Sequence, residues 1–451
     1  MTAGKESLLQ SRGSERQFLF SRTDTGRLKE ISRLKTGDAD QVLQITWPDL
    51  LWDAHFIDHA LQHLQAAAQF AAMVVRLDPP EPEQETLAGS ETVDRQAEVA
   101  KILESACRQE KAMWGGIDSG LLGVFLPHKS GPQALELARN AQKRLQDKAG
   151  QTMTVGIAAY PTIGYQKSEI LDNARKALDH ATFFGPNSAV IFDSVSLNIS
   201  GDKLYEQADI RGAIAEFKKA IELDPSNVNV HNSLGVCFGL KGDYDKAIGE
   251  FEAAVSLEPE EYMALYNLGL VHMLTQQFDM ALELFLKADK INGDAYEVSF
   301  QTGKLYLEMG EPAKGRSFLE RAAALEPTSG AVHRCLGDCY AADSRVQEAI
   351  SAYRKAIKLN PQDAAAMSAL GCLFEVQGEN PEITLMFCRE SVGLAPENGL
   401  FRYRLGRLYS KQRRFEDALR EFKMAEQLGY DASEDIEEIE KNHPEHTRSQ
   451  H

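Results

Sequence analysis

Seven glycines recur through the second half of the chain at a nearly constant interval. They lie 34 residues apart, with one last step of 35: Gly201, Gly235, Gly269, Gly303, Gly337, Gly371 and Gly406. A period of this length is typical of a stacked array, in which every unit offers its neighbour the same surface. The sequence therefore predicts an all-α solenoid in the C-terminal half of a multidomain chain.

Each unit of this array fits a template of two helices. In the second unit, residues 228–261, Gly235 lets the first helix approach its partner, and Ala247 and Ala254 do the same on the second helix. Gly242 turns the chain, and Pro259 stands where a proline costs little. The spacing of small, large and turn residues resembles tetratricopeptide (TPR) repeats. We predict seven repeats over residues 194–432.

The later units depart from the template in two ways. The sixth has one extra residue, and Pro381 is expected to start its second helix. Gly315 and Thr384 replace the alanine of the other second helices, so the fourth and sixth units are expected to be the least stable. Residues 433–451 are predicted to form an acidic capping helix and a tail.

TPR arrays present a concave groove built mostly from their first helices, and the resemblance implies that this groove binds a segment of another protein. The side chains expected to line it are mainly apolar in the middle and partly basic toward the C-terminal end. The alternative is that the apolar strip packs against the N-terminal domain or a second copy of the chain. The predicted groove residues are Asn232, Val236, Leu240, Met263, Tyr266, Leu270, Met273, Leu274, Phe300, Lys304, Leu307, Arg334, Asp338, Tyr403, Arg407 and Lys411.

The N-terminal half reads as an extension over residues 1–48 and an α+β domain over 49–193. Short strands are predicted at 18–20 and 42–45 in the extension, which is expected to be partly disordered. In the domain, helical and strand patterns give the order β-α-β-β-α-β-α-β after a helix that starts at Asp53. This order suits a sheet covered by helices on one face.

Three segments of this domain look like successive parts of the GGDEF (diguanylate cyclase) family: residues 121–127, 153–161 and 170–178. The resemblance implies a palm-like fold. The signature positions fall on residues 118–122, where Gly120 and Leu121 replace the acidic pair. The phosphate-contacting lysine of the family corresponds to Thr182, and the inhibitory Arg-x-x-Asp site would fall on Gln109 and Ala112.

The family's metal-binding carboxylate on the first strand corresponds to Arg76, with Asp78 kept. Cyclisation of GTP depends on carboxylates that hold two metal ions against the triphosphate, and Arg and Leu side chains cannot ligate magnesium. We therefore expect a catalytically inactive domain with no catalytic or metal-binding residues and no cofactor. Arg76 and Asp78 remain candidates for contact with a nucleotide phosphate.

Composition narrows the class of partner. The net charge of −18 argues against a general nucleic-acid binder, and no apolar run has the length of a membrane span. The first residues lack the apolar stretch of a secretion signal, and the six cysteines are scattered through helical patterns. These features favour a cytoplasmic protein.

Two further clusters suggest metal chemistry. His55, His59 and His63 share a helical spacing, and Cys335 and Cys339 share a helix face. A solvated helix face explains the histidines, and buried packing explains the cysteines.

The sequence thus favours a protein-binding scaffold, in which a degenerate GGDEF-like domain precedes the TPR array, in bacterial signalling or assembly. The alternative is a receptor for GTP or cyclic di-GMP, or a residual nucleotide cyclase. The predicted partner is another protein or peptide segment, and self-association is a further expectation for the apolar strip.

Overall fold

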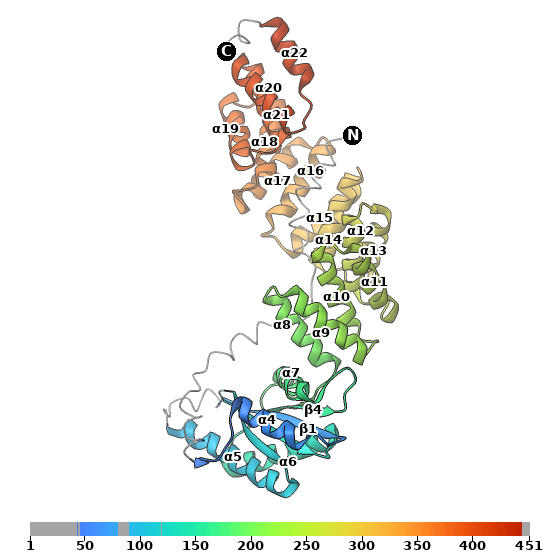
Figure 1. Cartoon of the computed structure of the whole chain (residues 1–451). Coiled ribbons are helices and arrows are strands. Elements are labelled where there is room, and N and C mark those ends of the chain that lie inside the picture. Colours follow the sequence, from blue (N-terminus) through green and yellow to red (C-terminus); the bar gives the residue numbers. More distant parts are fainter. Residues whose placement is uncertain (1–42, 44–45, 80–89, 119, 444–451) are drawn as a thin grey trace. The chain divides into compact units, whose positions relative to one another are not determined.

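The computed structural model describes residues 43, 46–79, 90–118 and 120–443 (Figure 1). The expected N-terminal strand at 18–20 and the tail after residue 443 lie outside these ranges. The described chain forms two compact bodies, one ending at Pro259 and the other beginning at Glu260. Each is treated by itself below.

The first body begins with a five-stranded sheet. Its strands are β1 (Phe70–Leu77), β2 (Met113–Asp118), β3 (Leu121–Pro127), β4 (Met153–Tyr160) and β5 (Ala189–Ile191). Their spatial order is β2-β3-β1-β4-β5, and only the β4–β5 pair is parallel. Central β1 pairs with both β3 and β4 along nearly its whole length, and most of its side chains are buried.

Helices cover both faces of this sheet. On one face, α5 (Ser90–Glu110) and α6 (Gly131–Ala149) pack against alternate strand residues such as Met73 and Val124. On the other lie α4 (Asp53–His63) and α7 (Ile170–Thr182). Gly156 makes room for α7, since a Cβ there would stand 2.1 Å from the Ala174 carbonyl oxygen. The expectation that helices cover one face is therefore wrong.

The expected strand at 42–45 is also wrong where the structure describes it. Leu43 is helical, and its carbonyl oxygen accepts a hydrogen bond from the Trp47 backbone N–H (2.9 Å). Its side chain is fully buried in the core formed by α5, α6 and the sheet. Burial of a single apolar residue does not distinguish a short helix from a strand, and this explains the error.

Two helix pairs complete the first body: α8 (Ser194–Glu206) with α9 (Ile210–Leu223), and α10 (Val228–Lys241) with α11 (Tyr244–Leu257). Helix α8 follows β5 directly, because Asp193 caps it by accepting a hydrogen bond from the Ser196 N–H (2.9 Å). Two ion pairs join α7 to this first pair, Lys203–Asp179 (2.5 Å) and Lys176–Glu216 (2.8 Å).

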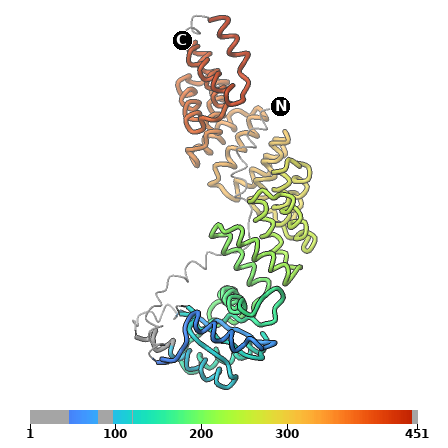
Figure 2. The backbone as a smooth tube through the Cα atoms, in the orientation of Figure 1, coloured from blue at the N-terminus to red at the C-terminus, as the bar shows by residue number. Residues whose placement is uncertain are grey.

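The second body continues with helix pairs of the same kind, which Figure 2 follows along the backbone. Pro381 begins a second helix, as predicted, and an acidic helix closes the array. The helices are α12 (Tyr262–Leu274), α13 (Phe278–Ile291), α14 (Tyr296–Glu308), α15 (Pro312–Leu325), α16 (Gly330–Ala342), α17 (Val346–Leu359), α18 (Ala364–Gln377), α19 (Pro381–Leu394), α20 (Gly399–Lys411), α21 (Phe415–Gln427) and α22 (Ser433–Asn442).

The periodic glycines are spacers within each helix pair. A Cβ on Gly235 would stand 2.6 Å from the Phe251 ring, and a Cβ on Gly337 would stand 2.5 Å from the Tyr353 ring. The other five glycines meet the equivalent side chain of their own second helix, which is Phe217, Phe285, Leu319, Cys388 or Phe422. The first helix can therefore lie against a large buried side chain only where it carries no side chain itself.

A second periodic series marks the turn between the two helices of each pair. One residue there adopts a left-handed backbone conformation: Ala208, Gly242, Gln276, Gly310, Ser344, Gly378 and Arg413. Its spacing follows that of the glycine spacers, including the single step of 35. The backbone therefore repeats the same turn even where the residue is not glycine.

Candidate functional site

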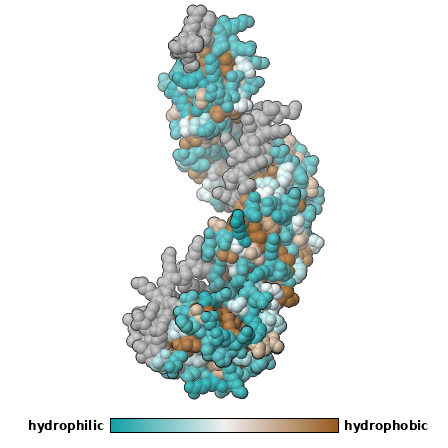
Figure 3. Space-filling model, viewed as in Figure 1, coloured by the Kyte–Doolittle hydropathy of each residue, from teal (hydrophilic) through white to brown (hydrophobic). Residues whose placement is uncertain are grey.

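The candidate site in the second body is the surface formed by the predicted groove residues of its first helices, and we call it the groove face. Its residues are Met263, Tyr266, Leu270, Met273, Leu274, Phe300, Lys304, Leu307, Arg334, Asp338, Tyr403, Arg407 and Lys411. Successive first helices contact one another from α12 to α20, so these positions form a continuous strip. Hydrophilic residues make up most of the surface visible in Figure 3, with hydrophobic residues in patches between them.

The N-terminal end of the groove face consists of apolar side chains of α12 and α14. Tyr266, Leu270, Met273 and Phe300 are at most 5% exposed. Phe300 stacks on Tyr296 with ring centroids 5.8 Å apart, and Tyr266 approaches Phe285 at the same distance. The expected strip of exposed apolar side chains is therefore not observed at this end. Of the predicted residues here, Met263, Lys304 and Leu307 are half-buried.

The C-terminal end of the groove face is polar and open. Arg334 of α16 lies 3.3 Å from the Asp363 carboxylate and 3.6 Å from that of Asp338. Asp338 also accepts a hydrogen bond from the Tyr353 hydroxyl (2.7 Å). This network holds the Arg334 guanidinium in place while a third of its side chain stays exposed.

Helix α20 adds the most exposed cations of this end. Arg407 and Lys411 both pair with Glu375 of α18, yet their side chains are 44% and 59% exposed. Two cations facing one carboxylate leave positive charge available to a ligand. Tyr403 is half-buried, and its pKa is raised to about 12, chiefly by burial and also by Asp435.

The three predicted groove residues of the first body lie on α10. Asn232 and Val236 are 5% and 1% exposed, and Leu240 is half-buried. None of the three is an open surface residue. On the same helix, His231 Nδ1 lies 2.8 Å from the Glu250 carboxylate. This hydrogen bond raises the pKa of His231, because it favours the protonated imidazole.

The two candidate nucleotide contacts lie on β1 and just beyond its end. The Arg76 Nη2 donates to Thr182 Oγ1 (3.0 Å), which ties β1 to α7. Asp78 is 8% exposed, and its carboxylate accepts hydrogen bonds from Thr154 Oγ1 (2.5 Å) and from the Asn187 N–H (2.7 Å). These bonds give Asp78 a structural role, since they hold the left-handed turn at Asn187.

The signature-like hairpin between β2 and β3 is held by α7. Arg175 donates to the Ile117 carbonyl oxygen (2.9 Å) and lies 3.5 Å from the Asp118 carboxylate. The Asp118 side chain is 61% exposed. Arg175 therefore partly neutralises the charge of Asp118, the one carboxylate of this hairpin.

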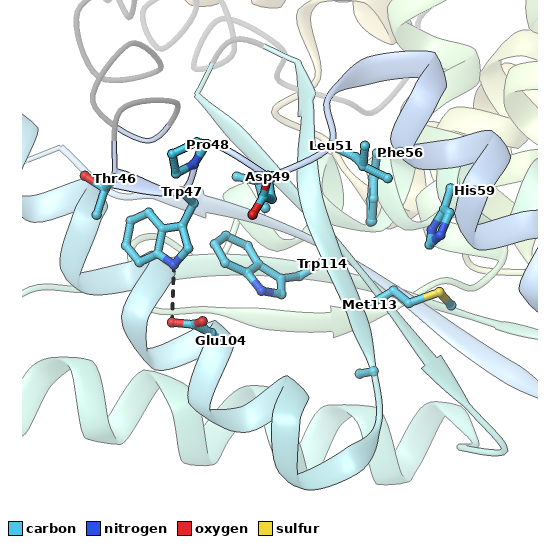
Figure 4. Close-up of a pocket in the computed structure, with 12 residues that line it drawn as sticks. Thr46, Trp47, Pro48, Asp49, Leu51, Phe56, His59, Glu104, Met113 and Trp114 are labelled. Atoms are coloured by element: carbon cyan, nitrogen blue, oxygen red, sulfur yellow. Dashed lines mark hydrogen bonds between the residues drawn. The ribbon is translucent and has the colours of Figure 1, made fainter.

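A cavity of about 540 Å³ that no sequence pattern predicted lies beside β2 (Figure 4). Trp47 and Trp114 meet edge to face there at 5.7 Å, and Trp47 Nε1 donates to Glu104 Oε2 (3.2 Å). Arg108 also donates to Glu104 (2.8 Å), so this carboxylate already has two partners. Trp47 and Trp114 are 67 residues apart, and no local pattern could have indicated that they meet.

The suggested metal ligands do not form a cluster. His59 and His63 lie with ring centroids 4.3 Å apart on α4, but the described residues contain no group of three or more His, Cys, Asp or Glu placed to hold an ion. Cys335 and Cys339 are buried, and burial raises their thiol pKa values to about 11 and about 12. These thiols remain protonated and unreactive at neutral pH.

Within the described chain, no helix combines the length and hydropathy that crossing a bilayer requires. A search of curated proteins found no match to this sequence.

Several solved structures are similar to part of this chain. YrrB, a TPR protein with an unusual peptide-binding site, is 19% identical over 44% of this chain and 97% of its own, with a TM-score of 0.38. PilF of Pseudomonas aeruginosa is also 19% identical, over 45% and 92%, with a TM-score of 0.42. A TPR protein from Parabacteroides merdae ATCC 43184 is 17% identical over 55% and 97%, with a TM-score of 0.43.

Matches to protein-family models identify the helix pairs. Residues 201–242 match the TPR repeat model, and residues 241–296 and 300–382 match a tetratricopeptide repeat model. Proteins with such repeats generally mediate protein–protein interactions. The helix pairs across these residues are therefore tetratricopeptide repeats.

Proposed function

We propose that this chain is a protein–protein interaction scaffold and that the groove face of its second body binds a segment of another protein. One observation carries the proposal. Equivalent helix positions change from buried aromatic and aliphatic side chains on α12 and α14 to exposed cations on α20. A surface that is apolar at one end and cationic at the other suits a ligand that binds in one orientation only, because each end accepts side chains of a different kind.

The cationic end identifies the kind of segment. Arg407 and Lys411 exceed their shared partner Glu375 by one charge, and both side chains are well exposed. A guanidinium binds carboxylates in a bidentate geometry. The proposed ligand is therefore an extended or helical protein segment that places acidic residues against α20.

The test reverses charge at the open end, where the side chains of Arg407 and Lys411 are well exposed. We expect Arg407→Glu with Lys411→Glu to lower the affinity for a captured partner by at least about tenfold, since each charged contact contributes about 1 kcal/mol or more. Partners are captured from a lysate, identified by mass spectrometry, and their affinity for the purified chain is then measured.

The matched control is Lys355→Glu with Lys358→Glu on α17. Both of these lysines are exposed, and the change in net charge is the same. A partner that binds both double variants and the wild type equally would contradict the proposal.

We also propose that the α+β domain is a GGDEF-like domain without cyclase activity, in a bacterial cytoplasmic context. The resemblance of three segments supports this, and so does the use of Arg76 and Asp78 in internal hydrogen bonds. We expect no cyclic di-GMP from GTP and magnesium. Calorimetry of the full chain with GTP and cyclic di-GMP gives the second measurement. Micromolar binding that Arg76→Ala abolishes would instead support the receptor hypothesis.

A further inference from the structure

All three tryptophans of this 451-residue chain lie at or beside the cavity that adjoins β2. Trp47 and Trp114 line the cavity. The Trp52 indole lies against Gly116 of β2, where a Cβ would stand 2.0 Å from the ring. Each of the three side chains is half-buried and packs at the edge of the core. Large half-buried rings that gather at one cavity indicate a surface that binds a ligand.

One wall of this cavity is formed by the chain segment before α4, residues 46–52, which lies against β2. The Gly116 N–H donates to the Leu51 carbonyl oxygen (3.1 Å), and Trp52 and Gly116 form a bridge of the parallel type. This approach depends on two adjacent glycines, because a Cβ on Gly115 would stand 2.6 Å from the same Leu51 oxygen. Backbone contacts thus hold this wall in place before any ligand binds, which lowers the entropy cost of binding.

The charge of the cavity is negative. The described residues that line it include the carboxylates of Asp49 and Glu104 and no lysine or arginine. Figure 4 shows both carboxylates together with the Trp47 and Trp114 rings. Arg108 donates to Glu104, but its side chain is 77% exposed, so solvent screens its charge. The faces of indole rings also attract cations, because their π electrons make the face negative. The cavity therefore favours a cationic ligand.

We propose that this cavity binds a small organic cation, a molecule with an ammonium group on an apolar body. The ammonium group faces the Trp47 and Trp114 rings and the two carboxylates, where cation–π attraction and charge pairing both stabilise it. The apolar body covers the side chains of Leu50 and Met113, which also line the cavity. A volume of about 540 Å³ is in the range of sites that enclose a small molecule.

The same chemistry argues against the anionic ligands considered for this domain. GTP and cyclic di-GMP carry phosphates, which the carboxylates in the wall of the cavity repel. Arg108, the cation that donates to Glu104, does not itself line the cavity. The inference concerns the first body alone. Its failure would therefore leave the binding of a protein segment by the groove face of the second body unaffected.

The test compares choline with its neutral isostere 3,3-dimethylbutan-1-ol, because the two have the same shape and differ by one charge. Tryptophan fluorescence of the full chain reports on this site alone, since the chain has no other tryptophan. Sodium chloride at the same concentration controls for ionic strength. We expect choline to change the fluorescence saturably and to bind at least about tenfold more tightly than the isostere. Equal binding of the two, or no saturable change with choline, would overturn the inference.

Two variants locate the bound cation. Glu104→Gln removes a charge and keeps an acceptor for the Trp47 Nε1–H, and Asp49→Asn removes the charge of an exposed side chain. Each is expected to weaken choline binding severalfold and to leave binding of the isostere unchanged. Asp147→Asn removes the same charge from an exposed position of α6 and should change neither. Choline binding that neither cavity variant weakens, or that Asp147→Asn weakens equally, would overturn the assigned site.

Discussion

At the scale of single residues, the glycine spacers explain why the repeat period is so strict. Each spacer faces the ring, the aliphatic side chain or the thiol that fills the space between its two helices. Phe251, which faces Gly235, is fully buried and cannot move aside without disturbing the next helix. A side chain at the spacer position would therefore separate the pair.

This leads to a prediction with a control in the same repeat. Gly235→Ala is expected to lower the free energy of unfolding by about 1–3 kcal/mol, the usual cost of overpacking a core. Gly249→Ala lies on the second helix with no atom within 4 Å of the added Cβ. It should raise stability by about 0.5–1 kcal/mol through helix propensity. Urea unfolding followed at 222 nm gives both values, and equal signs would contradict the spacer role.

A second prediction at this scale concerns pH. The Glu250 hydrogen bond raises the pKa of His231 above its unfolded value of about 6.5, so folding favours the protonated imidazole. The added stability is present below about pH 6.5 and is lost as the pH rises through the raised pKa. Its size is about 1 kcal/mol, as for a partly exposed charged hydrogen bond.

The measurement is thermal unfolding at about pH 5.5 and about pH 8. Glu250→Gln should reduce the difference between the two temperatures by the contribution of this pair. Glu252→Gln, an exposed change on the same helix, serves as the control. A difference that persists unchanged in Glu250→Gln would remove His231 as its source.

At the scale of helices and strands, much of the structure could be predicted because its signals are local. The glycine period, the alanines and the turn residues predicted the helix pairs, and Pro381 marked the start of α19. The order β-α-β-β-α-β-α-β expected from the apolar patterns of the α+β domain is the order in which β1 to β5 and α5 to α7 occur. The lower stability expected of the fourth and sixth units stays a prediction.

The errors concern relations between elements. The apolar stripe of α7 indicates that it packs, but not on which face of the sheet, so the second layer of helices was missed. The groove residues Tyr266 and Phe300 show the same limit. An apolar side chain on an exposed binding strip and one that is buried have the same sequence pattern. The cavity at Trp47 and Trp114 depends on a tertiary contact that no periodicity encodes.

At the scale of the whole molecule, the array needs protection where the repeats end. Helix α22 buries Ile436 and Ile439 in the cluster that also contains Phe422 and Leu405 of the last pair. Its remaining residues are mostly acidic and exposed. The helix therefore replaces the missing next repeat with a charged outer surface.

The prediction is that Ile436→Asp with Ile439→Asp detaches this helix and causes association of chains through the uncovered apolar surface. Sedimentation velocity should show species heavier than the wild type, increasing with concentration. Ser433→Asp with Asn442→Asp adds the same charge at exposed positions of the same helix and should leave sedimentation unchanged. A monomeric Ile436→Asp/Ile439→Asp chain would show that α22 is dispensable.

The direct passage from β5 into α8 has a mechanical consequence. Asp193 caps the helix at the point where the strand ends, and Lys203–Asp179 and Lys176–Glu216 bridge α7 to the first helix pair. A load applied along the chain would thus meet no slack segment between the α+β domain and the first repeat. The junction therefore transmits tension directly, because the first repeat is held rigidly against the sheet domain.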